Sequence, residues 1–198
     1  DGLAAEGIAT QFVEVADDTR INVKVKAGEE TEINGAGPRI SDEKLAELES
    51  ILAGLTSDDT VVFAGSAPSS LGNQVYNTLI PIAKQAGAEV VCDFEGQTLL
   101  DALNYQPLLV KPNNHELAAI FDVTLNGLAD IEKYARELLA KGAKNVIISM
   151  AGDGALLVTP EAAYFAKPIK GTVKNSVGAG DSMVAGFTGE YVKSGDPI

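Results

Sequence analysis

Residues 173–187 read VKNSVGAGDSMVAGF, a glycine-containing loop followed by apolar residues at the spacing of one helix face. Gly178 and Gly180 have no Cβ atoms, so the backbone there can turn sharply and lie close to a ligand. The first N–H groups of a helix have no partner within the helix, and the positive end of the helix dipole lies beside them. The stretch therefore predicts a loop that enters a helix and can bind an anion.

Asp181 directly follows the second glycine and has two interpretations. Aspartate is a preferred N-cap residue, so its carboxylate could accept a hydrogen bond from the first turn of the helix. It could also be a base that removes the proton from a hydroxyl held beside the bound anion. The local sequence by itself favours the helix cap.

The composition limits the classes of function. With 198 residues and 45% apolar content, the chain can bury a core and is expected to form one domain. Its 28 acidic and 15 basic residues give a net charge of −13, which argues against a sequence-independent nucleic-acid binder. An anionic substrate must then be held by local positive groups, backbone amides or a metal ion.

The single cysteine, Cys92, excludes an internal disulfide and suits a reducing compartment. It lies in the strand-like run Glu89 to Asp93, so we expect a buried apolar residue rather than a nucleophile. With one histidine and no C-x-x-C pair, a zinc site is not expected. No stretch resembles a membrane span or a signal peptide, so the expectation is a cytoplasmic enzyme without a membrane or nucleic-acid partner.

The opening DGLAAEGI is typical of the end of a helix, and the residues that follow it predict strands. Gln11 to Val15 is typical of a strand, and residues 19–37 alternate apolar and polar side chains in the pattern of a half-exposed antiparallel ribbon that turns at Ala27 to Glu29. A two-stranded ribbon is not stable alone, so it must cover something or pair with a partner chain. Its exposed edges predict a homodimer formed through the ribbon.

After Pro38 the chain alternates between helices and unbroken apolar strands, which is typical of a doubly wound, mostly parallel sheet with helices on both faces. In such sheets ligands bind at the carboxyl ends of the strands. The predicted helices are 41–55, 73–85, 96–103, 115–120 and 131–141, the predicted strands are 61–64, 90–92, 108–110 and 146–149, and the segments 154–159 and 163–166 predict a hairpin at the far edge.

Polar residues collect at three of these strand ends, and each group also has a simpler interpretation. Ser66 could bind a substrate, but it lies in AGSAPSS, which has the composition of any loop. In VKPNNHE, Lys111 supplies a positive charge, while Asn113 and Glu116 have the spacing of a capping box. His115 is taken as a surface or packing residue.

The third strand end carries SMAGDGA, with Ser149, Gly152 and Gly154. Its small residues allow close approach of a ligand to the backbone, although Gly-Asp-Gly is also a strong turn former. The chain has no G-x-x-x-x-G-K-[ST] loop and no G-x-G-x-x-G fingerprint. Arg20, where the ribbon begins, is a fourth candidate, since a guanidinium is suited to a phosphate but a single arginine is usually surface.

Taken in order along the chain, these motifs resemble those of the PfkB (ribokinase-like) carbohydrate kinases. The resemblance implies that the G-A-G-D loop, Gly178, Ala179 and Gly180, forms an anion hole and that Asp181 is the catalytic base. It implies further roles for the other candidates: Lys111, Asn113, Glu116, Ser149, Gly152 and Gly154 bind ATP, Glu116 acts on Mg²⁺ indirectly through water, and Arg20 and Ser66 bind the sugar phosphate.

The ribbon TRINVKVKAGEETEINGAGP resembles that of the bacterial 1-phosphofructokinase branch of this family more than that of ribokinase or adenosine kinase. This implies ATP- and Mg²⁺-dependent phosphorylation of fructose 1-phosphate to fructose 1,6-bisphosphate. A tagatose-6-phosphate kinase, a nucleoside kinase and an inactive nucleotide- or sugar-binding module stay open. The resemblance spans residues 1–198 as a partial kinase domain with a lid ribbon at about 19–37, because the family's amino-terminal strand, its G-G-K-G-x-N motif and its last helices are absent.

Overall fold

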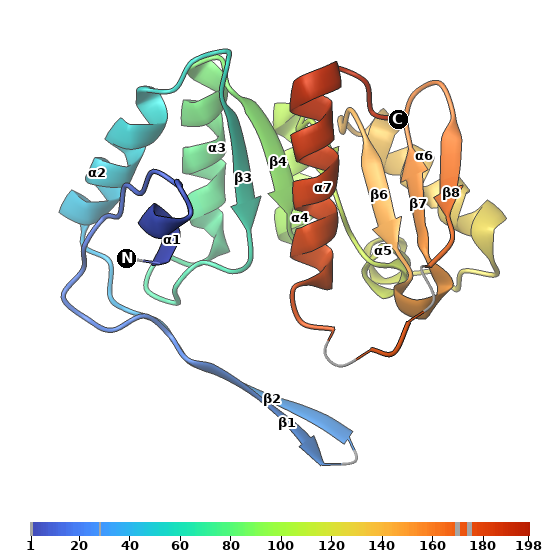
Figure 1. Cartoon of the computed structure of the whole chain (residues 1–198), viewed down its shortest axis with the longest axis horizontal. Helices are drawn as coiled ribbons and strands as arrows, with labels where there is room; N and C mark the ends of the chain where they lie inside the picture. Colours follow the sequence, from blue (N-terminus) through green and yellow to red (C-terminus); the bar gives the residue numbers. More distant parts are fainter. Residues whose placement is uncertain (1, 28, 169–170, 174–175) are drawn as a thin grey trace.

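The computed structural model describes residues 2–27, 29–168, 171–173 and 176–198 (Figure 1). The helices are α1 (Gly2–Ala5), α2 (Asp42–Ala53), α3 (Tyr76–Gln85), α4 (Gly96–Ala102), α5 (Asn114–Phe121), α6 (Leu128–Ala140) and α7 (Ala179–Ser194), with short 3₁₀ turns at Asn73–Val75, Leu103–Tyr105 and Ala151–Asp153. The strands are β1 (Asn22–Ala27), β2 (Glu29–Asn34), β3 (Thr60–Ala64), β4 (Glu89–Asp93), β5 (Leu109–Val110), β6 (Val146–Ser149), β7 (Ala155–Val158) and β8 (Ala163–Ala166).

Six strands form the main sheet, in the spatial order β3-β4-β5-β6-β7-β8. The first four strands are parallel, and β7 and β8 pair antiparallel at the far edge. This confirms the mostly parallel sheet and the terminal hairpin that the sequence predicts. The carboxyl ends of the four parallel strands consequently lie along one edge of the sheet.

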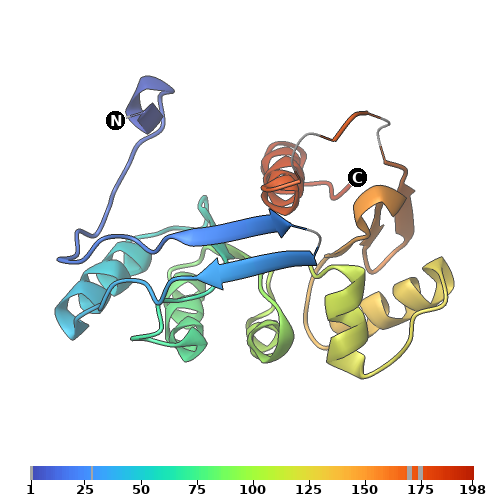
Figure 2. The ribbon, with the colours of Figure 1, turned by 90° about the horizontal axis from the view of Figure 1, so that it is seen from below.

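Helices cover both faces of the sheet, with α2 to α6 on one face and α7 on the other (Figure 2). Successive strand side chains point to opposite faces, so the strands β4 to β7 contribute side chains to two cores. Val90 and Cys92 belong to the core beneath α3 to α6, whereas Val91 between them packs in the core that contains Val184 of α7. This division explains why the parallel strands read as unbroken apolar runs.

One predicted strand is absent: residues 11–15 form no regular structure. Phe12 in this segment is 69% exposed. The run Gln11 to Val15 is typical of a strand, but within the described residues no strand lies beside this segment to complete a hydrogen-bonded ladder. The sequence prediction at Gln11 to Val15 is therefore wrong for this chain.

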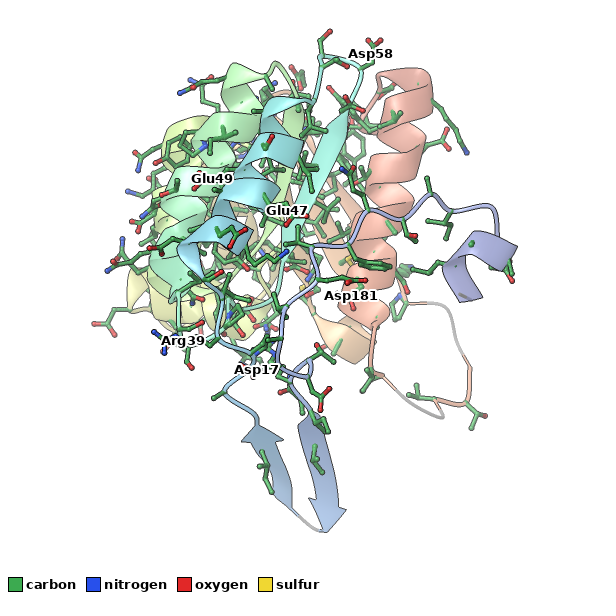
Figure 3. The ribbon with its side chains drawn as sticks, turned by 90° about the vertical axis from the view of Figure 1, so that its left-hand side faces the viewer. Asp17, Arg39, Glu47, Glu49, Asp58 and Asp181 are labelled. Atoms are coloured by element: carbon green, nitrogen blue, oxygen red, sulfur yellow. The ribbon has the colours of Figure 1, made fainter. Side chains whose placement is uncertain are left out.

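β1 and β2 form the antiparallel ribbon, with Val23 opposite Ile33. It extends away from the body of the molecule on the side of the carboxyl ends of the parallel strands (Figure 1). The predicted turn at Ala27 to Glu29 includes Gly28, which lies outside the described residues. Where the ribbon leaves the body, the amide of Arg39 donates to Asp17 Oδ2 at 3.1 Å, and both residues are labelled in Figure 3.

Of the helices in the described ranges, none has both the length and the apolar character that a membrane crossing needs.

Candidate active site

Two cavities lie side by side at the carboxyl ends of the parallel strands. The first, called here the acidic cavity, has a volume of about 520 Å³ and is lined by Arg20, Gly65, Ser66, Asn73, Asp93, Phe94, Glu95, Thr98, Lys111, Glu116, Gly180 and Asp181. The second, called here the glycine cavity, has a volume of about 580 Å³ and is lined by Asn113, Asn114, His115, Ser149, Met150, Ala151, Gly152, Asp153, Gly154, Ser176, Ala179, Gly180 and Met183.

The first turn of α7 separates the two cavities. Gly178 is the N-cap residue of α7 with φ 80°, a left-handed conformation that favours glycine, and as a glycine it provides no side-chain cap. Asp181 is the third residue of the helix and lines the acidic cavity; Figure 3 shows it at the N-terminal end of α7. The helix-cap interpretation of Asp181 is therefore wrong, and its carboxylate belongs to the cavity wall.

Gly180 lines both cavities, so its main chain can be reached from either side. A Cβ atom at this position would lie 3.1 Å from Lys111 Nζ, closer than an ordinary carbon–nitrogen contact. The absence of a side chain lets the ammonium of Lys111 lie directly against the N-terminus of α7. Amides of the first helical turn and a lysine ammonium thus share one small region, which suits the binding of a phosphate group.

Lys111 follows β5 directly and is only 7% exposed. Its Nζ lies 3.2 Å from Oδ1 of Asp93, the last residue of the neighbouring strand β4. Burial raises the pKa of Asp93, Lys111 acts in the opposite direction, and the charge of Asp181 raises it further. The sequence analysis does not single out Asp93, because at the end of an apolar strand an aspartate looks like an ordinary loop residue.

The capping-box interpretation of Asn113 and Glu116 is correct. Asn113 Oδ1 accepts from the amides of His115 and Glu116 at 2.9 Å, and Glu116 Oε2 accepts from the amide of Asn113 at 2.8 Å. Glu116 also lines the acidic cavity, so the structural contact does not remove it from the site. Burial raises the pKa of Glu116, while the amide of Asn113 and the ammonium of Lys111 act in the opposite direction.

The glycine cavity brings together the other predicted nucleotide-binding residues. An isolated parallel bridge joins Asn113 to Ser149, which places the VKPNNHE and SMAGDGA segments side by side. Gly154 has φ 102°, and a Cβ there would collide with the carbonyl oxygen of Ala166 in β8. The turn interpretation of Gly-Asp-Gly is therefore also correct, and the same turn forms a wall of the cavity.

Arg20 and Ser66 are hydrogen-bonded to each other on the wall of the acidic cavity. Arg20 Nη1 donates a hydrogen bond of 2.6 Å to Ser66 Oγ, which joins the start of the ribbon to the loop after β3. A guanidinium has five N–H donors, so this bond leaves others for an anion in the cavity. The structure thus brings together the two residues that the sequence analysis assigns to the sugar phosphate.

Several lining residues have no counterpart in the sequence analysis. Besides Asp93, these include Asn73, Phe94, Glu95 and Thr98 in the acidic cavity, while Asn114, Met150 and Asp153 of the glycine cavity lie in quoted segments without being named as candidates. His115, assigned there to the surface or to packing, lines the glycine cavity. Their sequence signal is weak because most are common loop or helix-start residues, and only the folded sheet brings them next to the G-A-G-D loop.

Cys92 is buried, and burial raises the pKa of its thiol to about 12. A thiol in this state is not a nucleophile near neutral pH, as the sequence predicts. Among the described residues, no group of three or more His, Cys, Asp or Glu side chains is placed to bind a metal ion directly.

Comparisons with known proteins identify the family to which the chain belongs. The family model described as "pfkB family carbohydrate kinase" matches residues 1–197. The chain is 50% identical over 185 residues to a protein of Bacillus subtilis (strain 168) named 1-phosphofructokinase, an alignment that covers 93% of this chain and 61% of the relative. It is 36% identical over 190 residues to a Bacillus licheniformis protein named D-tagatose-1-phosphate kinase, covering 95% of this chain and 62% of the relative.

Among solved structures, the chain resembles phosphofructokinase-2 from Escherichia coli in complex with fructose-6-phosphate. The TM-score is 0.85 at 31% sequence identity, and the match covers 96% of this chain and 64% of that one. This likeness confirms the ribokinase-like fold that the sequence predicts. The chain spans about three fifths of the length of the curated relatives that it matches.

Proposed function

We infer the function of this chain from the fact that it belongs to the pfkB family of carbohydrate kinases. We propose that it is part of an enzyme that transfers the γ-phosphoryl group of ATP to a primary hydroxyl of a sugar phosphate. The proposed acceptor is the C6 hydroxyl of fructose 1-phosphate, with fructose 1,6-bisphosphate as the product. The name of the Bacillus subtilis relative supports this choice, and that of the Bacillus licheniformis relative makes a tagatose phosphate the second candidate.

The observation that carries the proposal is the position of Gly180 on the boundary of the two cavities. The glycine cavity offers small residues and main-chain groups to the phosphates and ribose of ATP, with Ser149, Gly152 and Gly154 on its wall. The acidic cavity offers Arg20 and Ser66 to the phosphate already on the sugar. A phosphoryl group that passes between the two substrates would then cross at the first turn of α7.

In the proposed mechanism, Asp181 orients the sugar hydroxyl and accepts its proton. The hydroxyl oxygen forms a bond to the γ-phosphorus, the bond from that phosphorus to the β,γ-bridging oxygen breaks, and ADP leaves with the electron pair. Because the transition state of phosphoryl transfer is loose in most analyses, the proton can leave late and positioning matters more than basicity. The amides of Gly178 and Gly180 and the ammonium of Lys111 would stabilise charge on the transferring group, whereas the amide of Ala179 donates to the carbonyl of Ser176.

The acidic cavity fits an indirectly bound Mg²⁺. This ion keeps several water ligands and binds through one or two carboxylates together with substrate phosphates. Both oxygens of Glu116 accept hydrogen bonds from Asn113, so Glu116 would act on the ion through water. When bound, Mg²⁺ would neutralise part of the negative charge of the nucleotide phosphates.

Phosphoryl transfer with a panel of sugars and sugar phosphates tests the proposal in the intact protein. Replacement of Asp181 by Asn should lower kcat by about 10² to 10⁴-fold, with little change in nucleotide affinity. Near-normal turnover in this variant would remove Asp181 from its role. A protein that binds ATP but phosphorylates no acceptor would instead be a binding module, and one that prefers unphosphorylated nucleosides would be a nucleoside kinase.

The ribbon supports a homodimer. Ile21, Val23 and Ile33 are 75%, 45% and 60% exposed, so apolar side chains of the ribbon face solvent in the single chain. Pairing with a second copy would bury them. Replacement of Val23 and Ile33 by Asp should convert a dimer to a monomer in analytical ultracentrifugation, and a monomeric wild-type protein would refute the dimer. A cytoplasmic location stays a prediction.

A further inference from the structure

Asp93 and Lys111 form a largely buried ion pair on the wall of the acidic cavity. Their side chains are 18% and 9% exposed, and Asp93 Oδ1 lies 3.2 Å from Lys111 Nζ. The pairing follows from the sheet, because Cys92 and Val110 are neighbours in the register of β4 and β5 and each precedes one of the charged residues. The two side chains therefore leave adjacent strands at the same level.

The ammonium of Lys111 also lies against the first turn of α7. The space that a Cβ of Gly180 would occupy is 3.1 Å from Nζ, and Asp181 is the next residue of the helix. Asp181 and Lys111 line the same cavity, and the charge of Asp181 acts on Asp93. Lys111 thus binds the carboxylate of Asp93 and lies beside the helical turn that carries Asp181, to which the proposed function assigns the proton transfer.

A lysine ammonium is a compact charge on a flexible four-carbon stem, so it moves to whichever acceptor is near. Without Asp93, the carboxylate of Asp181 would be an acceptor close to Nζ on the same cavity wall. An ion pair with Lys111 would occupy an oxygen of Asp181 that the sugar hydroxyl needs. It would also withdraw the positive charge from the N-terminus of α7, where the transferring phosphoryl group is stabilised.

We propose that Asp93 is a positioning residue that acts through Lys111. By binding the ammonium, it keeps Lys111 against the N-terminus of α7 and leaves Asp181 free to accept the proton of the acceptor hydroxyl. This inference rests on the proposed kinase function for its effect on turnover. The position of Lys111, which is the geometric part of the inference, does not depend on the proposed kinase function.

Kinetics of the intact protein test the inference. In Asp93→Asn the side chain keeps its shape and loses its charge, and kcat should fall by about 10 to 100-fold, as expected for misplaced catalytic groups. The KM values for ATP and for the sugar phosphate should stay within about twofold, because the variant retains Arg20 and the glycine cavity. Asp93→Glu should recover part of the loss. A rise in KM with unchanged kcat would overturn the proposal.

A double-mutant cycle separates this role from an independent one. Lys111→Met lowers kcat itself, and adding Asp93→Asn to it should cause no further loss, since the ammonium that Asp93 positions is gone. If the double variant loses kcat by the product of the losses in the two single variants, the proposal is overturned. The double variant removes both buried charges together, so it leaves neither unpaired and should fold even if Asp93→Asn does not.

Glu89→Gln is the matched control. Glu89 begins β4, whereas Asp93 ends it, and Glu89 pairs with Lys84 and Lys144 away from both cavities. This control should leave kcat unchanged. An equal loss of kcat in Glu89→Gln would assign the effect of Asp93→Asn to general damage to the strand and would overturn the proposal.

A crystal structure of the Asp93→Asn variant gives a readout that does not depend on activity. The expected result is Lys111 Nζ bound to Asp181, and an ammonium that stays against Gly180 would overturn the inference. If the wild-type protein phosphorylates no acceptor, the kinase proposal fails, while this structure still decides the position of Lys111. If the variant does not crystallise, Asp93→Glu takes its place, and Lys111 should then remain bound to the longer carboxylate.

Discussion

Replacement of Gly180 by Ala places one methyl group between the helix terminus and Lys111. The added Cβ would lie 3.1 Å from Nζ and 3.5 Å from Cε of Lys111. An ordinary contact between such atoms is about 3.5 to 4.0 Å, so the ammonium must retreat by roughly half an ångström. Since a misplacement of about 1 Å can cost about 10²-fold in rate, we expect kcat to fall by about tenfold.

The same substitution should stabilise the fold. Ala is favoured over Gly within a helix by about 1 kcal/mol, and the side chain that must move is a flexible one. For a domain of this size, 1 kcal/mol corresponds to a rise in Tm of about 2 to 4 °C. We therefore expect Gly180→Ala to have the same or a higher Tm in calorimetry and a lower kcat in steady-state kinetics than the wild-type protein.

Gly186 in the same helix provides the control. A Cβ at Gly186 would meet no atom within 4 Å, so Gly186→Ala has the gain in helix propensity without contact to Lys111. It should raise Tm and leave kcat unchanged. Equal kcat values for Gly180→Ala and the wild-type protein, with Lys111 displaced in the crystal structure, would refute the reasoning that its position governs the rate.

Three further predictions follow from the site and its surroundings. Arg20→Ala should raise the KM for the sugar phosphate and leave that for ATP unchanged, and equal changes in both would contradict its assignment to the acidic cavity. Cys92, whose thiol pKa burial raises to about 12, should resist iodoacetamide at pH 8 in the folded protein and react after addition of denaturant, and rapid labelling without denaturant would be inconsistent with its burial. Burial raises the pKa of Glu89, but Lys144 and Lys84 outweigh it and hold that pKa below its ordinary value of 4.5, so its stabilising contribution is present above pH 4.5 and is lost as the pH falls further. Urea unfolding should therefore show Glu89→Gln to be less stable than the wild-type protein at pH 7 and similar to it near pH 3, and a difference of the same size at both pH values would exclude this ion pair as the cause.

The sequence predicts the main sheet well because three of its four parallel strands, β4, β5 and β6, are buried on both faces. Val90, Val91 and Cys92 are all buried, and a short unbroken apolar run between two predicted helices is typical of a buried parallel strand. The pattern at Gln11 to Val15 is equally strand-like, yet a strand also requires a neighbour, and local sequence carries no information about which neighbours are present. Residues 11–15 were mispredicted for this reason.

In the candidate site, too, the sequence predicts one part and does not predict another. The G-A-G-D loop can be recognised in the sequence because turn, helix start and acid are consecutive in the chain, and Asp181 lines the acidic cavity. The same reasoning does not identify Asp93, since the positioning role proposed for it depends on Lys111, eighteen positions later in the chain. Only the register of β4 against β5 makes the two neighbours, and register is a property of the assembled sheet.

The two cavities with a shared wall at Gly180 also bear on the order of events in a catalytic cycle. Because the two cavities share only Gly180 among their lining residues, both substrates of the proposed kinase can be bound at the same time. Double-reciprocal plots at several fixed concentrations of the second reactant should consequently intersect, as in a ternary-complex scheme, rather than run parallel as they would for a phosphorylated enzyme intermediate.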